Sequence, residues 1–221
     1  MTPNDVFANV AYDGILGLGF PKWAVKDTVT VLENIDRQKP IKRKIFSFWL
    51  TSNGGVLMFG GYNQEHIQED HTYVPVITRP NKDFWKIRMS TILIGQEPTE
   101  HCVPHCTAII DSGTTDIIGP QAAIKDINLA VGAFGNGGVV PCSTVDKLPI
   151  ITFTIGKKAF PLGPREYIAE DNSICFTRFV PDSGSRWFLG IAFMRRYHTV
   201  FDFEDMKTSD RICNCSSSIT A

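Results

Sequence analysis

The amino-acid sequence predicts an all-β protein with few short helices. Short runs rich in β-branched and aromatic residues recur along the 221-residue chain, and clusters of Gly, Pro, Asn and Asp separate them. The tetrapeptide Ser-Asn-Gly-Gly at 52–55 lies between two such runs and is a typical β-hairpin turn. Helical periodicity occurs only twice and briefly. A chain of this length can form one large all-β unit.

Eight runs have the composition of β-strands and are bounded by turn-forming residues. They span residues 45–51, 55–61, 72–77, 84–94, 107–111, 149–155, 174–180 and 197–203. Two helices are expected, each after a proline, because proline is favoured in the first helical turn. They follow Pro21, over 22–35, and Pro120, over 121–131.

The composition allows a sizeable core and excludes two classes of partner. Hydrophobic residues make up 43% of the chain, with 15 Phe and 4 Trp. The net charge of −1 gives no electrostatic footprint for nucleic acid or an anionic membrane surface. No apolar run approaches the ~20 residues that a membrane-spanning helix needs. We therefore expect no nucleic acid partner and no membrane span.

Six cysteines fall into three local groups, which are Cys102 with Cys106, Cys142 with Cys175, and Cys213 with Cys215. An even number of cysteines in loops between strands favours an oxidising compartment. The N-terminal segment, however, contains Asp5 and Asp13 and has neither the basic nor the apolar region of a signal peptide. We therefore expect the chain to begin inside a longer polypeptide.

Residues 106–120 read Cys-Thr-Ala-Ile-Ile-Asp-Ser-Gly-Thr-Thr-Asp-Ile-Ile-Gly-Pro and place Asp111 at the end of an apolar run. Gly113 permits a sharp turn immediately afterwards. A bare Asp-Ser-Gly is commonly a simple Asx turn, but the apolar residues on both sides and the final Gly favour a catalytic carboxylate. Hydrogen bonds to such a carboxylate stabilise its ionised form. The available hydroxyl groups are on Ser112, Thr114 and Thr115.

This segment resembles the active-site motif of the pepsin-like aspartic peptidases, the family of pepsin, gastricsin and cathepsin D. Four further stretches are similar to other parts of the family. Residues 12–21 resemble a late first-lobe motif, and 84–94 resemble the strand that opens the second lobe. Residues 140–168 continue in register, and 186–205 resemble the closing region. The likeness runs from about residue 7 to about residue 207.

The resemblance implies a pepsin-like acid protease fold and a catalytic dyad of two carboxylates that share a proton and hold a water molecule. One carboxylate acts as base toward that water while the other donates to the scissile carbonyl; pepsin is the usual example of such a dyad. Asp111 is then the second-lobe member, and Thr114 donates a hydrogen bond to it. Ser112 faces its first-lobe counterpart, and Gly190 lies beneath the motif. No cofactor is implied.

The family resemblance also implies disulfides between Cys102 and Cys106 and between Cys142 and Cys175. The residues His101, Cys102, His105 and Cys106 could instead suggest zinc. Four ligands within six residues around Pro104 do not easily surround one tetrahedral ion, so a short disulfide loop is preferred and no metal is expected. His66 and His71 are interpreted as polar loop residues.

The position of the other carboxylate follows from an internal comparison. An apolar-apolar-Gly triplet occurs at 15–17, 117–119 and 188–190. Because the two lobes of the family are an ancient duplication, the spacing from Asp111 to Gly190 can be measured back from Gly17. It places the first-lobe Asp, and the flap hairpin after it, before residue 1. A second Asp-Ser-Gly at 182–184 follows Pro181 and is interpreted as a surface turn without flanking apolar strands.

The expected organisation is therefore a truncated first lobe with the inter-lobe strands over 1–80, a complete-looking catalytic lobe over 81–207, and a divergent polar tail over 208–221. The tail has lost the family's apolar strand and is expected to pair poorly in a buried sheet. Ile191 stands where the family often has Asp, a position that is expected to be structural. Asp116 could favour a basic substrate residue, but a solvated loop acid is the preferred interpretation.

Three functions are compatible with these observations. The first is an aspartic endopeptidase acting on peptides or proteins, with the missing first-lobe segment as a further partner. The intact family member is then secreted or lysosomal/endosomal. The second is a non-catalytic isoform or fragment that binds peptides or a protein. The third pairs two copies of the Asp111 motif, but it requires a flap that the chain does not obviously contain. The first is preferred, and this chain alone is expected to be inactive.

Overall fold

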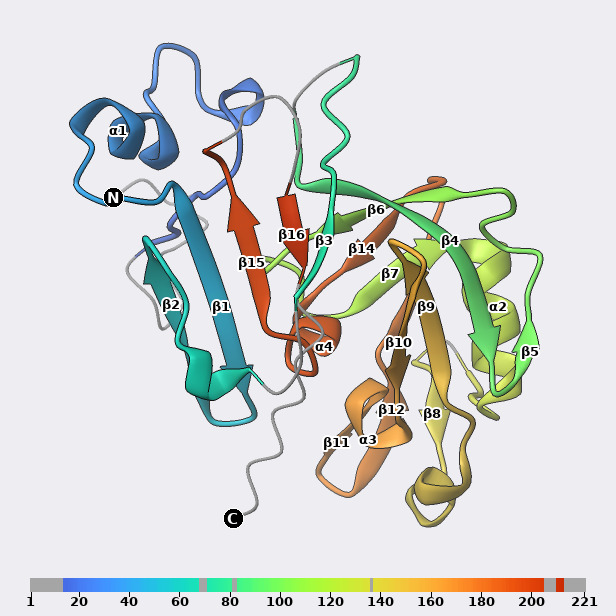
Figure 1. The fold of residues 1–221 in the computed structure, drawn as a ribbon. Helices are drawn as coiled ribbons and strands as arrows, with labels where there is room; N and C mark the ends of the chain where they lie inside the picture. Colours follow the sequence, from blue (N-terminus) through green and yellow to red (C-terminus); the bar gives the residue numbers. More distant parts are fainter. Residues whose placement is uncertain (1–13, 68–70, 81–82, 136, 205–209, 213–221) are drawn as a thin grey trace, which may run out of the picture.

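The computed structural model describes residues 14–67, 71–80, 83–135, 137–204 and 210–212. Within these ranges the chain forms three β-sheets and a few short helices (Figure 1), in agreement with the predicted all-β class. The triplet at 15–17 and the second lobe are described, whereas the first 13 residues, Cys213, Cys215 and most of the tail lie outside the described residues.

One of the three sheets has five antiparallel strands. Its strand order is β2-β1-β15-β16-β3. The hairpin predicted at 52–55 joins β1 to β2, whose register pairs Thr51 with Gly54. Phe46 on β1 stacks on Phe201 of β15 with ring centroids 4.7 Å apart, which anchors the sheet on the core. The strands are β1 (Ile45–Thr51), β2 (Gly54–Phe59), β3 (Thr72–Val74), β15 (Thr199–Asp202) and β16 (Asp210–Ile212).

A second, larger sheet has the order β10-β9-β4-β6-β14-β7-β13, with β5 paired with β4. Alternate residues of the central strands face the core; Ile151, Phe153 and Ile155 of β9 are fully buried. The strands are β4 (Lys86–Ile94), β5 (Glu97–Pro98), β6 (Cys106–Ile110), β7 (Ile117–Pro120), β9 (Ile151–Ile155), β10 (Lys158–Leu162), β13 (Phe179–Asp182) and β14 (Trp187–Leu189).

A small third sheet and the helices cover the remaining surfaces. The third sheet has the order β11-β12-β8, with β8 (Val139–Val140), β11 (Ile168–Asp171) and β12 (Ile174–Thr177). Helix α2 begins directly after Pro120, as predicted, and buries Ala123, Ile124 and Ile127. The helices are α1 (Val31–Gln38), α2 (Gln121–Ala130), α3 (Pro164–Tyr167) and α4 (Ile191–Met194), with 3₁₀ turns η1 (Pro21–Trp23), η2 (Gln64–His66) and η3 (Cys142–Lys147).

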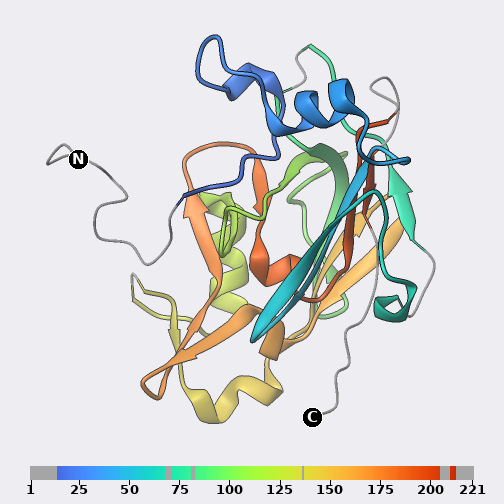
Figure 2. The ribbon, with the colours of Figure 1, turned by 90° about the vertical axis from the view of Figure 1, so that its left-hand side faces the viewer.

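The helix predicted directly after Pro21 is wrong in its start. Only the 3₁₀ turn η1 follows the proline, and α1 begins ten residues later, at Val31. The reason is a capping box: the Thr30 hydroxyl accepts from the Glu33 N–H while the Glu33 carboxylate accepts from the Thr30 N–H. The β-branched run before Thr30 disfavours an earlier start. In both views α1 lies beyond one end of the five-stranded sheet (Figures 1 and 2).

Two strand predictions are also corrected. The run 174–180 is two strands in different sheets, β12 and β13, because the chain crosses between the sheets at Arg178. In the tail, residues 210–212 were expected to pair poorly, yet they form β16 between β15 and β3. Strand pairing uses backbone groups, so a polar segment can fill the gap beside β15, all of whose residues are buried.

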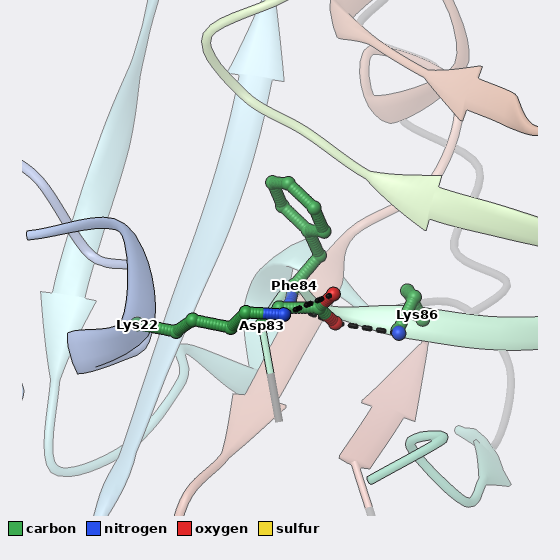
Figure 3. Close-up of polar contacts among 4 residues, drawn as sticks. All are labelled: Lys22, Asp83, Phe84 and Lys86. Atoms are coloured by element: carbon green, nitrogen blue, oxygen red, sulfur yellow. Dashed lines mark hydrogen bonds and ion pairs between the residues drawn. The ribbon is translucent and has the colours of Figure 1, made fainter. Parts of the chain in front are cut away.

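Polar contacts around Asp83 join the 14–38 segment to β4. The Asp83 carboxylate contacts Lys86 on β4, at 2.5 Å, and Lys22 in η1, at 3.7 Å (Figure 3). Burial raises the pKa of this carboxyl, but the hydrogen bond and charge of Lys86, with the charge of Lys22, outweigh it and leave the pKa lowered. The Trp85 indole N–H also donates to the Leu18 carbonyl, at 2.9 Å. These contacts hold the two parts of the chain in one arrangement.

None of the helices in the described part of the chain has the length and apolar character to span a membrane.

Candidate active site

The Asp111 segment is placed by an unusual order of three strands. Strand β14 lies between β6 and β7, parallel to β6 and antiparallel to β7. Leu189 thereby faces Ile110 on one side and Ile117 on the other, so the second and third apolar-Gly triplets lie side by side. The chain must leave β6, pass around the end of β14 and return as β7. Residues 111–116 form that connection.

The Asp111 carboxylate is held by its own loop. The Gly113 N–H donates to one carboxylate oxygen, at 2.9 Å, and the Thr114 hydroxyl donates to the other, at 2.7 Å. The backbone of Asp111 is fixed as well, since its N–H donates to the Leu189 carbonyl and its carbonyl accepts from the Thr114 N–H, both at 3.2 Å. Donors to both oxygens fix the orientation of the carboxylate.

The far half of the loop rests on the start of α4. The carbonyls of Thr114, Thr115 and Asp116 accept from the N–H groups of Ile191, Ala192 and Gly190, at 2.8, 3.0 and 3.2 Å. A β-carbon on Gly190 would collide with the carbonyl oxygens of Thr114 and Asp116. The triplet at 188–190 therefore ends in glycine because a side chain there would occupy the space of the loop backbone.

Replacing Gly190 with Ala is expected to destabilise the fold by about 1–3 kcal/mol, because the added methyl must push the loop off α4. Urea unfolding should show this as a lower midpoint with an unchanged slope. Gly113→Ala is the matched control, since its new β-carbon would meet only an Asp111 carboxylate oxygen, 3.2 Å away. Equal stability of the Gly190 variant and the wild type would contradict the close approach.

Arg178 supports the loop from the opposite side, and no sequence signal indicated it. Its guanidinium contacts the Asp116 carboxylate at 3.1 Å, and its carbonyl accepts from the Ile117 N–H at 2.8 Å. The guanidinium also lies over the Phe176 ring, 5.2 Å from its centroid. Asp116 is therefore an ion-paired residue, which leaves its carboxylate engaged within the lobe. Its partner is 62 residues away in the sequence.

The surface beside the loop is open. Ser112, Gly113 and Thr115 are exposed, and Asp111 and Thr114 are partly buried. A pocket of about 400 Å³ adjoins the loop at Thr115, Ile191 and Ala192, and its far wall carries charged side chains of α3 and the chain after α4. Among the described residues, no second carboxylate contacts Asp111. Within the described ranges, the hydrogen-bond partners of this carboxylate are the Gly113 N–H and the Thr114 hydroxyl.

Both disulfides implied by the family resemblance are present. Cys102 is joined to Cys106 and Cys142 to Cys175. The first engages both sulfurs of the His-Cys-Val-Pro-His-Cys segment, which removes them as thiolate ligands for zinc. His101 of that segment contacts the Asp126 carboxylate on α2, at 2.8 Å. Within the described ranges, no group of three or more His, Cys, Asp or Glu residues could hold a metal ion.

The second Asp-Ser-Gly is a turn, but it does have flanking strands. The Asp182 carboxylate accepts from the Gly184 N–H at 2.8 Å, which is the predicted turn chemistry. Asp182 itself, however, ends β13, and β14 begins at Trp187, so the expectation of no flanking strand is corrected. The predicted run 174–180 already contained the start of β13, whereas the three residues of β14 were not predicted as a strand.

The family pattern described as eukaryotic aspartyl protease matches residues 1–209. Together with the fold and the Asp111 loop, this match shows that the chain belongs to the eukaryotic aspartyl protease family.

Curated relatives agree with this family. Cathepsin D from Rattus norvegicus is 36% identical over 219 residues, which cover 91% of this chain and 53% of the relative. Pepsin A from Sus scrofa is 36% identical, with 90% and 54% covered. Pregnancy-associated glycoprotein 1 from Bos taurus is 34% identical, with 93% and 55% covered. The chain thus spans about half the length of the curated relatives it matches.

Proposed function

We propose that Asp111 is one of the two catalytic carboxylates of an aspartic endopeptidase, and that polypeptide outside these 221 residues supplies the other. One observation supports this more than any other. Each oxygen of the Asp111 carboxylate accepts a hydrogen bond from its own loop, and that loop is in turn fastened to α4. Such a carboxylate has a fixed orientation toward the exposed side of the loop, where a water molecule and a peptide bond can approach.

In the proposed reaction, the two carboxylates share one proton and bind one water molecule between them. The ionised carboxylate removes a proton from the water as the water oxygen attacks the scissile carbonyl carbon. The protonated carboxyl donates to the carbonyl oxygen, which gives a neutral tetrahedral diol. Because two carboxylates this close cannot both ionise, the pair titrates as a unit. The donors from Gly113 and Thr114 fix the orientation of the Asp111 carboxylate within this pair.

The substrates are peptides or proteins, and the partner of this chain is the first-lobe segment that carries the second Asp. A secreted or lysosomal compartment is supported by the two disulfides, which persist in oxidising surroundings. Exposed apolar side chains at the start of the described chain support a first-lobe partner, since Ile15 is 75% exposed and Leu16 is 55% exposed. In the second lobe the matching triplets are largely buried.

The test is a chimera in which the part of rat cathepsin D not covered by the match precedes this chain. The chimera should cleave a denatured protein at about pH 3–5, the range in which such a dyad holds one proton. Asp111→Asn in the chimera should abolish cleavage, while Asp182→Asn, in the other Asp-Ser-Gly, should leave it intact. Circular dichroism establishes folding separately, so a folded but inactive chimera would refute the proposal.

A non-catalytic binding protein is the second candidate function. It is favoured by the lack of a second carboxylate at Asp111 among the described residues. A folded chimera that binds a peptide with the same affinity before and after Asp111→Asn, and cleaves nothing, would support this candidate instead.

A further inference from the structure

We propose that a pair of aromatic rings beside the Asp111 loop, with a cation at each end, selects peptide substrates that carry an acidic residue close to the scissile bond. The rings are those of Trp23 and Phe84, here called the aromatic shelf, and the cations are Lys22 and Arg186. The inference rests on the proposed function, since it names a substrate class for the same site. These residues come from η1, from the chain before β4 and from the turn before β14.

The pairing of β4 with β6 places the aromatic shelf next to the Asp111 loop. This pairing continues as far as the Ile110 N–H, which donates to the Trp85 carbonyl at 3.1 Å. The next residues of the two segments, Phe84 and Asp111, are therefore neighbours across this edge of the sheet. Neighbouring side chains across an antiparallel pair have β-carbons about 4.5–8 Å apart. An extended peptide rises about 3.3 Å per residue, so a peptide bound at Asp111 reaches Phe84 within about three residues.

The two rings form a partly exposed apolar surface. Trp23 and Phe84 stack with ring centroids 5.5 Å apart and ring planes 28° apart. Trp23 is 64% exposed, and Phe84 is partly exposed although Trp85 beside it is buried. In Figure 3 the Phe84 ring points away from the Asp83 carboxylate. Because aromatic rings contribute strongly to binding at protein interfaces, the shelf offers an apolar contact to a substrate side chain.

Both ends of the aromatic shelf are positively charged. The Arg186 guanidinium carbon lies 5.6 Å from the Phe84 ring centroid, and the Lys22 ammonium nitrogen lies 5.6 Å from the Trp23 ring centroid. Arg186 is exposed, and among the described residues no carboxylate contacts its guanidinium. A guanidinium that lies over a ring keeps its N–H donors, which match the two oxygens of a carboxylate.

One carboxylate does lie near the aromatic shelf, but the protein already uses it. The Asp83 carboxylate contacts Lys86 at 2.5 Å and Lys22 at 3.7 Å, and its side chain is only 12% exposed (Figure 3). The contacts around the shelf thus join three cations, Arg186 included, with one carboxylate. The remaining charge is positive, so it attracts an acidic side chain of a bound peptide and repels a basic one.

The expected preference has a defined size and pH dependence. Lys and Arg side chains stay protonated at pH 3–5, whereas an Asp in a peptide has an ordinary pKa of about 3.9. The preference for Asp over Asn should therefore be nearly absent at pH 3 and fully developed at pH 5. Exposed ion pairs are weak and are screened by salt, so we expect about two- to fivefold tighter binding, decreasing as salt is added.

The experiment measures peptide binding to the full 221-residue chain by NMR. Four peptides share a central Phe-Phe bond and differ only in having Asp or Asn two residues from it, on the N-terminal or the C-terminal side. The Trp23 indole N–H signal, assigned with Trp23→Phe, reports binding at the aromatic shelf. At pH 5 the Asp peptide of one side should bind about two- to fivefold more tightly than its Asn counterpart. At pH 3 the two should bind almost equally.

Three charge variants test the residues. Arg186→Gln should remove the preference for Asp while the Asn peptide binds as before, and Lys22→Gln should reduce the preference. Lys125→Gln, at an exposed position of α2, removes the same charge elsewhere and should keep the preference. Circular dichroism checks that each variant folds. The proposal would be overturned by an undiminished preference in both shelf variants, by its loss in Lys125→Gln, or by an unshifted Trp23 signal at millimolar peptide.

Cleavage by the chimera described above separates this proposal from the proposed function. A chimera that cleaves the Asp and Asn peptides at equal rates at pH 5 would support the peptidase and contradict the role of the aromatic shelf. A chimera that cleaves neither peptide would contradict the peptidase. In that case the ratio of Asp to Asn binding on the full chain decides the role of the shelf by itself.

Discussion

The purified 221-residue chain, assayed on a denatured protein at about pH 3–5, is expected to cleave no faster than its Asp111→Asn variant. A single carboxylate cannot act as base toward the water and as acid toward the carbonyl in the same step. Removing one member of a catalytic unit commonly costs a factor of about 10⁴ or more in kcat. The alignment of the substrate that other parts of an intact enzyme provide is lost as well. In well-oriented reactions such alignment lowers the barrier by several kcal/mol.

The comparison needs two controls. An intact relative such as porcine pepsin A, assayed at the same concentration, sets the scale of full activity. A Ser112→Ala variant changes the exposed hydroxyl beside Asp111 without removing the carboxylate. Cleavage by the wild-type chain that disappears in Asp111→Asn would show that the chain is active by itself. A rate rising with the square of protein concentration would then indicate that two copies pair their Asp111 loops.

The second large effect is expected from the disulfide between Cys142 and Cys175. Replacing both cysteines with Ser should lower the free energy of unfolding by about 3–4 kcal/mol, because the bridge closes a sequence separation of 33 residues and restricts the unfolded chain. The bridge also joins η3 to β12, so its loss should free the small third sheet. Urea unfolding of the oxidised proteins at pH 7 measures the difference.

The disulfide between Cys102 and Cys106 provides the matched comparison. Its sequence separation is only 4 residues, so the same model gives about 2 kcal/mol for its removal. The two double variants should therefore differ clearly. An equal loss from both would show that native-state packing at the bridges, rather than restriction of the unfolded chain, determines their contribution.

The sequence alone predicted the helices and strands whose signal lies within a short stretch of neighbouring residues. The long apolar runs at 45–51 and 84–94 contain β1 and β4, and Pro120 marked the start of α2. The start of α1 was missed because the signal is a reciprocal pair of hydrogen bonds between Thr30 and Glu33, which outweighs a nearby proline. Strands such as β5, β8 and β14, of two or three residues, were missed because so short a run has too little periodicity to be recognised.

In the candidate site, too, the local features could be predicted from the sequence and the long-range contacts could not. Asp111 and Thr114 are close in sequence, and the hydrogen bond that the family resemblance implied between them is present. The hydrogen bond from the Gly113 N–H was not predicted. The support from Arg178 and the grouping of His71 with His198 arise only when distant segments meet in the sheets. A single sequence does not indicate which distant segments come into contact. His66 and His71, interpreted as polar loop residues, are in fact partly buried; His66 stacks on Trp49, and His71 packs edge-on against Tyr62.

The placement of β14 between β6 and β7 has a consequence for biosynthesis. Strands β6 and β7 are made early, but the strand that joins them begins at Trp187. At translation rates of roughly 5–20 residues per second, the ribosome needs about 4–16 s to proceed from Asp111 to Leu189. During that interval two apolar strand edges have no partner, and unpaired edges invite association with other chains. The nascent chain is therefore most vulnerable to aggregation just before the Asp111 loop can close.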